Sequence, residues 1–220
     1  MSVEWYGMVK SDSFSENART TRKEFEKVIK SNRWDDVFSR LEENPDLINA
    51  TLLDDPLWYS PLHYFIEENA PVEILEKAIS LGAWRTLKTR NDEKAIDIAL
   101  RKGRHALVSL LTPVYCHNME LESLSKIQKH FHEVIIRRIN MLPNWKALRL
   151  PDLEVLLELE DPNMWFAVPG MYGGFNYWLA YNRDKTIRLI SENWSRIVGG
   201  SGQRHEITPK GSELVEEGFV

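Results

Sequence analysis

The sequence predicts an α+β protein in which a helical N-terminal region precedes a smaller, β-rich C-terminal region. Between residues 20 and 142, apolar residues recur at intervals of three and four, which is the spacing of amphipathic helices. After Asp161-Pro162 the sequence becomes rich in aromatic and β-branched residues, and Pro-Gly and Gly-Gly pairs interrupt it, as is typical of strands and tight turns. We therefore expect two domains, residues 1–161 and residues 162–220.

The composition is that of a globular protein and excludes several classes of function. The chain has 220 residues, of which 43% are hydrophobic and 28% are charged, so it can bury a substantial core. Its net charge of -5 argues against nucleic acid as a partner, because phosphate binding needs a basic face. No apolar stretch approaches the roughly 20 residues that a membrane helix requires, so we expect no membrane partner.

The cysteine and histidine positions argue against a metal site and predict a reducing compartment. A single cysteine, Cys116, excludes a disulfide framework and any zinc site built from several cysteines. His130 and His132 are two residues apart, so on a helix they point to different faces and cannot share a metal. We expect a cytoplasmic protein without a metal or cofactor.

The first helices follow from the positions of apolar and capping residues. Thr20 or Thr21 can cap a helix over residues 20–32, and a second helix begins near residue 33 and ends before Asn44-Pro45. The short connection makes these two helices antiparallel neighbours. Further along the chain, residues 118–142 have one apolar side and end at Pro143, which predicts a long helix, and residues 151–160 predict a short one.

Two further segments share a repeated pattern. Residues 60–83 open with Ser60-Pro61-Leu62-His63, where the serine can cap a helix and the proline fits its first position. Residues 94–111 begin 34 residues later and repeat the apolar positions. The pattern resembles the ankyrin repeat family, whose repeat opens with T-P-L-H-x-A and has a period of about 33 residues.

The ankyrin resemblance implies a solenoid of stacked helix pairs and a structural hydrogen bond for His63. Under this resemblance, the helix pair over residues 20–47 is a divergent first repeat. The helices after residue 118 then either cap the second end of the solenoid or bridge to the region that follows. The sequence departs from the family where Trp58 and Asp92 replace a glycine and where Phe65 replaces an alanine. The full expectation is an N-terminal ankyrin-like helical solenoid followed by a small antiparallel β-rich domain.

The C-terminal region predicts three or four antiparallel strands. We expect strands at 165–168, 175–181 and 185–191, and a glycine turn that connects Arg196 to residues 205–208. The tail after Thr208 is expected to form a helical turn that packs Leu214, Val215 and Phe219 on the sheet. Residues 168–175 ("VPGMYGGF") and 193–208 resemble segments of bacterial ankyrin-containing proteins of the toxin-immunity kind. That resemblance implies a small cytosolic inhibitor that binds and neutralises a toxin.

An aromatic and acidic surface on the helical repeats predicts a basic protein partner, because aromatic side chains anchor interfaces and acidic ones attract positive charge. For Trp84, filling a gap between repeats is the alternative interpretation. The residues predicted to bind the partner are Asp54, Asp55, Trp58, Tyr59, Tyr64, Glu67, Glu68, Trp84, Arg85, Arg101, Arg204 and His205.

The stretch "RIVGGSGQRHE", residues 196–206, is the main candidate for catalysis. It lacks the lysine of a phosphate-binding loop, and no glycine follows two residues after Ser201 as a nucleophile elbow requires. A hairpin turn or a partner-binding loop explains its glycines better. We therefore predict a non-catalytic protein. The alternative is an enzyme that uses Arg196, Arg204, His205 and Glu206 and recruits its substrate through the repeats.

Overall fold

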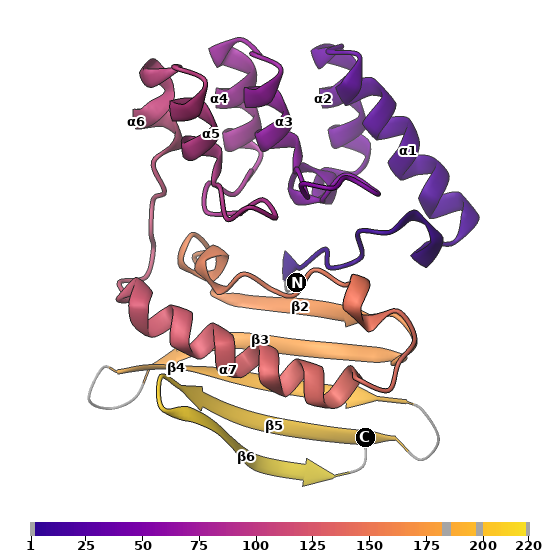
Figure 1. Cartoon of the computed structure of the whole chain (residues 1–220), viewed down its shortest axis with the longest axis vertical. Helices are drawn as coiled ribbons and strands as arrows, with labels where there is room; N and C mark the ends of the chain where they lie inside the picture. The colour runs from indigo at the N-terminus through magenta and orange to yellow at the C-terminus, as the bar shows by residue number, and fades with distance from the viewer. Residues whose placement is uncertain (1–2, 182–185, 197–199, 219–220) are drawn as a thin grey trace. The chain divides into compact units, whose positions relative to one another are not determined.

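The computed structural model describes residues 3–181, 186–196 and 200–218 and divides the chain into two compact units (Figure 1). The helical unit comprises Val9–Val114. The sheet unit comprises Met1–Met8 together with Tyr115–Val220. The division at residue 114 differs from the boundary near residue 162 that composition suggests, because the long helix that follows residue 120 packs on the sheet and belongs to its unit.

The helical unit is built from short helices of unequal length. They are α1 (Glu16–Lys30), α2 (Trp34–Glu43), α3 (Pro61–Glu67), α4 (Val72–Ser80), α5 (Ala95–Arg101) and α6 (Val108–Leu111), with 3₁₀ turns η1 (Ser11–Ser13), η2 (Pro45–Asn49) and η3 (His105–Leu107). Phe65 of α3 is fully buried and lies edge-on to Trp34 of α2, with ring centroids 5.4 Å apart. The large side chain at position 65 therefore fills the space between the two helix pairs.

His63 has a structural role at the start of α3. Its Nδ1 lies 2.8 Å from the Ser60 hydroxyl, and its Nε2 lies 3.0 Å from the carbonyl oxygen of Leu87. The ring is buried and connects the N-terminus of α3 to the loop before α5. This is the structural bond expected for His63, and it occupies both ring nitrogens.

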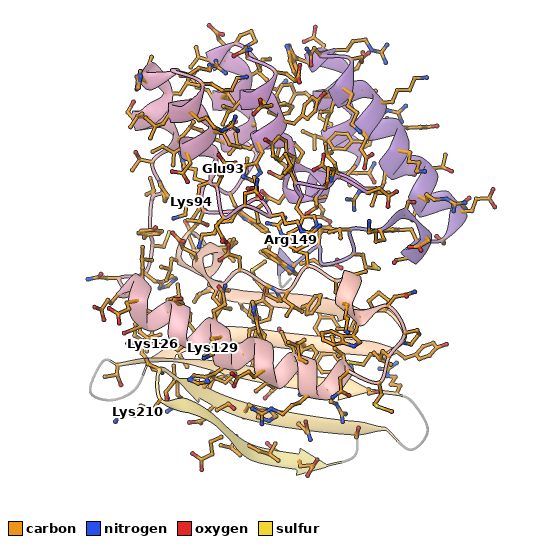
Figure 2. The ribbon with its side chains drawn as sticks, viewed as in Figure 1. Glu93, Lys94, Lys126, Lys129, Arg149 and Lys210 are labelled. Atoms are coloured by element: carbon orange, nitrogen blue, oxygen red, sulfur yellow. The ribbon has the colours of Figure 1, made fainter. Side chains whose placement is uncertain are left out.

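The sheet unit contains one six-stranded mixed sheet. Its strands are β1 (Val3–Glu4), β2 (Asn163–Val168), β3 (Gly173–Tyr181), β4 (Ile187–Ser195), β5 (Ser201–Thr208) and β6 (Gly211–Gly218), and they lie side by side in chain order. β1 pairs parallel to β2, and all other pairs are antiparallel. The N-terminal segment is held to this unit by Arg149, whose guanidinium lies 5.1 Å from the Trp5 ring centroid and whose carbonyl oxygen accepts a hydrogen bond from the Trp5 indole (Figure 2).

Helix α7 (Leu121–Ile139) packs along one face of this sheet (Figure 1). Its apolar side is fully buried, and Phe131 lies 5.0 Å from the ring centroid of Tyr177 and 6.4 Å from that of Phe175. Two 3₁₀ turns follow, η4 (Trp145–Ala147) and η5 (Leu153–Leu157). The hydrophobic core of the sheet unit therefore lies between α7 and the sheet.

The α+β class is confirmed, but the more detailed fold prediction is wrong. The helices of residues 9–114 range from 15 residues in α1 to four in α6, and their arrangement gives no support for an ankyrin solenoid. The helix predicted to cap that solenoid or to bridge to the β region is α7, and it packs on the sheet as part of the sheet unit. The β region is a mixed sheet that includes a strand from the N-terminus, so it is neither small nor wholly antiparallel.

The tail is also different from the prediction. Residues 211–218 form the edge strand β6 and not a helical turn, and Leu214 and Val215 are each 45% exposed. Pro209 and Lys210 form a two-residue turn that reverses the direction of the chain. The residues after this turn form β6, which pairs antiparallel to β5. Phe219, Lys185 and residues 197–199 of the glycine-rich stretch lie outside the described residues.

Candidate functional site

The face of the sheet opposite α7 carries three tryptophans and a set of charged side chains. Because side chains alternate along a strand, residues in register across strands share a face. One row reads Trp165, Asn176, Glu192, Arg204 and Glu216 from β2 to β6. Other rows of the same face add Trp178, Arg188, Trp194, Glu206 and Glu213. We call this surface the tryptophan face, and its three tryptophans are half-buried.

Glycine at position 174 makes room for a pair of stacked indoles. The rings of Trp165 and Trp194 lie 4.6 Å apart with an interplanar angle of 24°. A β-carbon on Gly174 would lie 2.2 Å from the carbonyl oxygen of Phe166 and 2.8 Å from the Trp165 ring, so only glycine fits beneath the stack. Gly202 is the neighbour of Trp194 on β5, and Gly218 is the next neighbour on β6. The stacked indoles thus border a strip of sheet without side chains.

A shallow pocket occupies this strip. It has a volume of ≈ 230 Å³ and is lined by Glu192, Asn193, Trp194, Gly202, Gln203, Arg204, Glu216 and Gly218. The indole of Trp194 supplies an apolar wall, the carboxylates of Glu192 and Glu216 supply negative charge, and Arg204, which lies 3.5 Å from Glu192, supplies one positive charge. An aromatic wall combined with carboxylates is the chemistry that recognises a cation.

Ion pairs cross the strands on the tryptophan face. Arg204 lies 3.5 Å from Glu192, and Arg188 lies 3.4 Å from Glu206. Both members of the first pair are 39% exposed and both members of the second are 32% exposed, so solvent screens them. The Arg204 guanidinium also lies 5.9 Å from the Trp178 ring centroid. These contacts hold long side chains in place without making them inaccessible.

The residues of the catalytic alternative are separated by the sheet. Arg204 and Glu206 lie on the tryptophan face, whereas His205, between them in sequence, points to the α7 side. Burial lowers the pKa of His205, and Arg137 lowers it further, while Glu217 opposes the shift. His205 and Glu206 therefore cannot act on one reacting group, and Arg196 follows the end of β4 as an exposed residue.

In the helical unit, the predicted residues before α3 shape a loop. The Asp55 carboxylate accepts hydrogen bonds from the backbone N–H of Leu57 and of Tyr59, at 2.8 and 3.3 Å. Asp54 and Trp58 both have positive φ, and the Asp54 carboxylate accepts a bond from the Ser11 N–H. The Ser11 side chain lowers the pKa of Asp54, and the bond from the Ser11 N–H lowers it further. These carboxylates hold the loop in its turn.

The predicted residues of α3 and α5 form an ion-pair network. Glu67 lies 3.2 Å from Arg101 and 3.4 Å from Lys102, and Arg101 also lies 2.9 Å from Glu93. Although burial opposes the shift, the two cations hold the pKa of Glu67 below its ordinary value. The Tyr59 hydroxyl donates to the same carboxylate. These side chains are engaged with one another within the helical unit.

The remaining predicted residues divide between core and surface. Trp84 is buried and Arg85 donates to the carbonyl oxygen of Leu110 at 2.9 Å, so both have structural contacts. Tyr64 is half-buried beside the exposed Glu68, and its pKa is raised by burial and by the carboxylates of Glu68 and Asp55. Tyr64, Glu68 and Asp55 therefore do come together as an aromatic and acidic patch.

Trp165, Trp178, Trp194 and Glu192 were missed as site residues. The signal was present in the alternation of strands β2 to β4, where buried residues alternate with half-buried ones that include Trp165, Trp178, Glu192 and Trp194. That alternation shows only that each strand has two faces. Which residues of separate strands adjoin depends on the register, and the register is set by pairing between distant segments.

The comparisons with known proteins add no relative. No family model matches the chain, and no curated protein or solved structure is significantly similar to it. Within residues 3–181, 186–196 and 200–218, His, Cys, Asp and Glu side chains nowhere gather in threes to form a potential metal site. In the same part of the chain no helix combines the length and the apolar character needed to cross a membrane.

Proposed function

We propose that this chain is a non-catalytic protein that binds another protein, and that the tryptophan face receives a basic side chain of that partner. The observation that carries the proposal is the pocket beside Trp194, which combines an indole wall with the carboxylates of Glu192 and Glu216. Tryptophan is enriched among the residues that dominate binding energy at protein interfaces. A lysine or arginine inserted there gains a cation–π contact and opposite charge at the same position.

The charge of the tryptophan face also favours a basic partner. Four carboxylates, those of Glu192, Glu206, Glu213 and Glu216, face two guanidiniums, those of Arg188 and Arg204. The whole chain has a net charge of -5, so its long-range field also attracts a positively charged protein. Complementary charge of this kind raises the rate of association and selects among partners.

In its most specific form, the partner is a bacterial toxin that the chain neutralises in the cytoplasm. The support for this form is the resemblance of residues 168–175 and 193–208 to toxin-immunity proteins. The second of these segments contributes Trp194, Gly202 and Arg204 to the pocket lining, so the resemblance covers the proposed site. A single cysteine, which is typical of reducing compartments, supports the cytoplasmic location.

The test captures the partner at a defined position. A photo-crosslinking amino acid replaces Asn176, which lies in the row between Trp165 and Glu192, and the crosslinked protein is identified by mass spectrometry. The affinity of the identified partner is then measured by calorimetry for the wild-type chain and for the variants Trp194→Ala and Glu192→Gln. We expect Trp194→Ala to weaken binding at least about tenfold, as a central interface tryptophan does.

Trp145→Ala is the matched control, because Trp145 is a half-buried tryptophan of the same unit that lies in η4 and outside the tryptophan face. We expect it to bind as the wild type does. Equal affinities for Trp194→Ala and Trp145→Ala would refute the proposal. Crosslinking from Tyr64 of the helical unit but not from position 176 would move the binding surface to the aromatic and acidic patch.

A further inference from the structure

Strand β6 is the outermost strand of the sheet, and its outer side is open. It is eight residues long and pairs with β5 alone (Figure 1). Within the described part of the chain, no hydrogen bond joins the backbone of residues 212–218 to any segment other than β5. Residues 213–218 are all exposed. The outer side of β6, which we call the β6 edge, is therefore accessible to another chain.

The β6 edge presents backbone donors and acceptors at particular residues. A two-residue turn joins β5 to β6, so Thr208 and Gly211, which flank the turn, form a hydrogen-bonded pair. Hydrogen-bonded and non-hydrogen-bonded pairs alternate along an antiparallel ladder, so the N–H and C=O groups of Ser212 and Leu214 point away from β5. Such a row of unpaired groups is a template onto which a further strand can pair.

The side chains along the β6 edge carry negative charge that is not neutralised. The strand contains three glutamates, Glu213, Glu216 and Glu217, and no lysine or arginine. Among the described residues, the carboxylates of Glu213 and Glu216 make neither an ion pair nor a hydrogen bond with another side chain. Arg204 is opposite Glu216 but pairs with Glu192 instead. A cation from outside the chain would therefore have two available carboxylates.

This charge decides which kind of strand can add to the β6 edge. Two copies of β6 paired antiparallel about the centre of Leu214-Val215 would place Glu213 of each copy opposite Glu216 of the other. Like charges directly opposite destabilise a strand pair, whereas opposite charges stabilise it. A bulge opposite Arg204 also interrupts the ladder. Charged side chains and bulges keep edge strands from pairing indiscriminately, but acidic side chains attract a strand that is basic.

We infer that the β6 edge binds an extended, basic segment of a partner protein, which adds to the sheet as a further strand. Main-chain hydrogen bonds to Ser212 and Leu214 supply affinity, and lysine or arginine side chains opposite Glu213 and Glu216 supply selectivity. Leu214 lies on the other face of the strand, so the segment alternates basic and apolar residues. The inference rests on the proposed function only in that the partner is a protein, because it uses the edge of the sheet and not the pocket beside Trp194.

The probe is a library of random ten-residue peptides displayed on phage and selected against the full chain. We expect enriched peptides that alternate lysine or arginine with apolar residues. Hydrogen exchange of the ¹⁵N-labelled full chain is then measured with and without one synthesised peptide. The amides of Ser212 and Leu214 should exchange at least about tenfold more slowly when the peptide is bound, because they gain hydrogen bonds. The amide of Glu213, which faces β5, should change less.

Two results of this experiment would overturn the inference. One is a selection that enriches no basic peptides. The other is a peptide that binds but leaves the amides of Ser212 and Leu214 as exposed to exchange as in the free chain, since the peptide then does not add as a strand.

A pair of double variants tests the role of charge. Glu213→Lys combined with Glu216→Lys should weaken peptide binding by about tenfold or more, because two attractive cross-strand pairs become repulsive. Glu160→Lys combined with Asp161→Lys is the matched control, since it makes the same change of charge at two exposed residues that precede β2. The control should bind as the wild type does. Equal weakening by both double variants would show that only the overall charge of the chain attracts the peptide, and it would contradict the inference.

The inference and the proposed function can fail separately. Capture of a partner from position 176, with an affinity that depends on Trp194, supports the proposed function. If the amides of Ser212 and Leu214 stay unprotected in that complex and with the selected peptides, the inference is wrong and the proposed function stands. If those amides are protected but Trp194→Ala binds the partner as the wild type does, the β6 edge is the binding surface and the tryptophan face is not.

Discussion

The two faces of the sheet are built from the same strands but from different kinds of residue. On the α7 side, Phe166, Phe175 and Tyr177 are fully buried against Phe131 and supply the core of the sheet unit. On the tryptophan face, the side chains are half-buried aromatics and partly exposed ion pairs, and such ion pairs contribute little to folding. The difference indicates that the first face stabilises the unit and that the second is available for recognition. The following predictions compare the two faces.

The largest effect is expected on the α7 side. Phe131→Ala removes a fully buried ring that contacts both Phe175 and Tyr177, and the free energy of unfolding should fall by about 3–5 kcal/mol. Trp178→Ala on the tryptophan face removes a larger ring that is only half-buried. It should lower the free energy of unfolding much less than Phe131→Ala does. Urea denaturation monitored by circular dichroism measures both. Equal losses would show that the tryptophan face also contributes to the core.

A smaller loss is expected where the two indoles stack. Gly174→Ala places a β-carbon 2.2 Å from the Phe166 carbonyl oxygen, so the strand or the Trp165 ring has to shift, and stability should fall by about 1–3 kcal/mol. Gly218→Ala is the control, because a β-carbon there meets nothing within 4 Å. Thermal unfolding measures both, and near-UV circular dichroism should show the disrupted Trp165–Trp194 stack only in Gly174→Ala.

A pH-dependent loss of stability is expected from the α7 side. Burial lowers the pKa of His132, whose Nε2–H donates to the Pro151 carbonyl oxygen, and it also lowers the pKa of His205. The folded state therefore favours the neutral rings, and their contribution is present above the unfolded-state pKa near 6.5 and is lost as the pH falls below it. Each group changes the unfolding free energy by at most about 1.4 kcal/mol per pH unit.

His132→Gln keeps a donor for the Pro151 carbonyl oxygen and removes the titrating ring, so the decline of stability between pH 7 and pH 5 should be less steep. Urea denaturation at several pH values measures this decline. His130→Gln is the control, because His130 is on the same helix and only 3.4 Å from the exposed Glu133. If both variants lose stability between pH 7 and pH 5 as steeply as the wild type, burial of His132 is not the cause of that loss.

The smallest effect is expected for the ion pair on the tryptophan face. Arg204 and Glu192 are each 39% exposed, so a double-mutant cycle with Arg204→Gln and Glu192→Gln should yield a coupling of less than about 1 kcal/mol. High salt should reduce it further. A coupling as large as the loss in Phe131→Ala would contradict the distinction between the two faces.

Several features of the fold were predictable because they depend on short stretches. The apolar spacing over residues 118–142 corresponds to α7, and Ser60-Pro61-Leu62-His63 correctly marks the start of α3, because capping and amphipathicity involve residues within a few positions of each other. The prediction failed at Leu214 and Val215, which were expected in a helical turn and lie in strand β6. Pairing with β5 favours the strand, and no local pattern reports that pairing.

Local patterns were therefore sufficient for the α+β class, for most of the helices and for the presence of strands after residue 162. Long-range pairing was needed for the rest. It brings Val3–Glu4 beside β2, and its register places Arg204 and Glu206 on one face of the sheet and His205 on the other. A shift of one residue would exchange the two faces, since side chains alternate along a strand. The tryptophan face depends on that register, which explains why the sequence showed its residues but not the face that they form together.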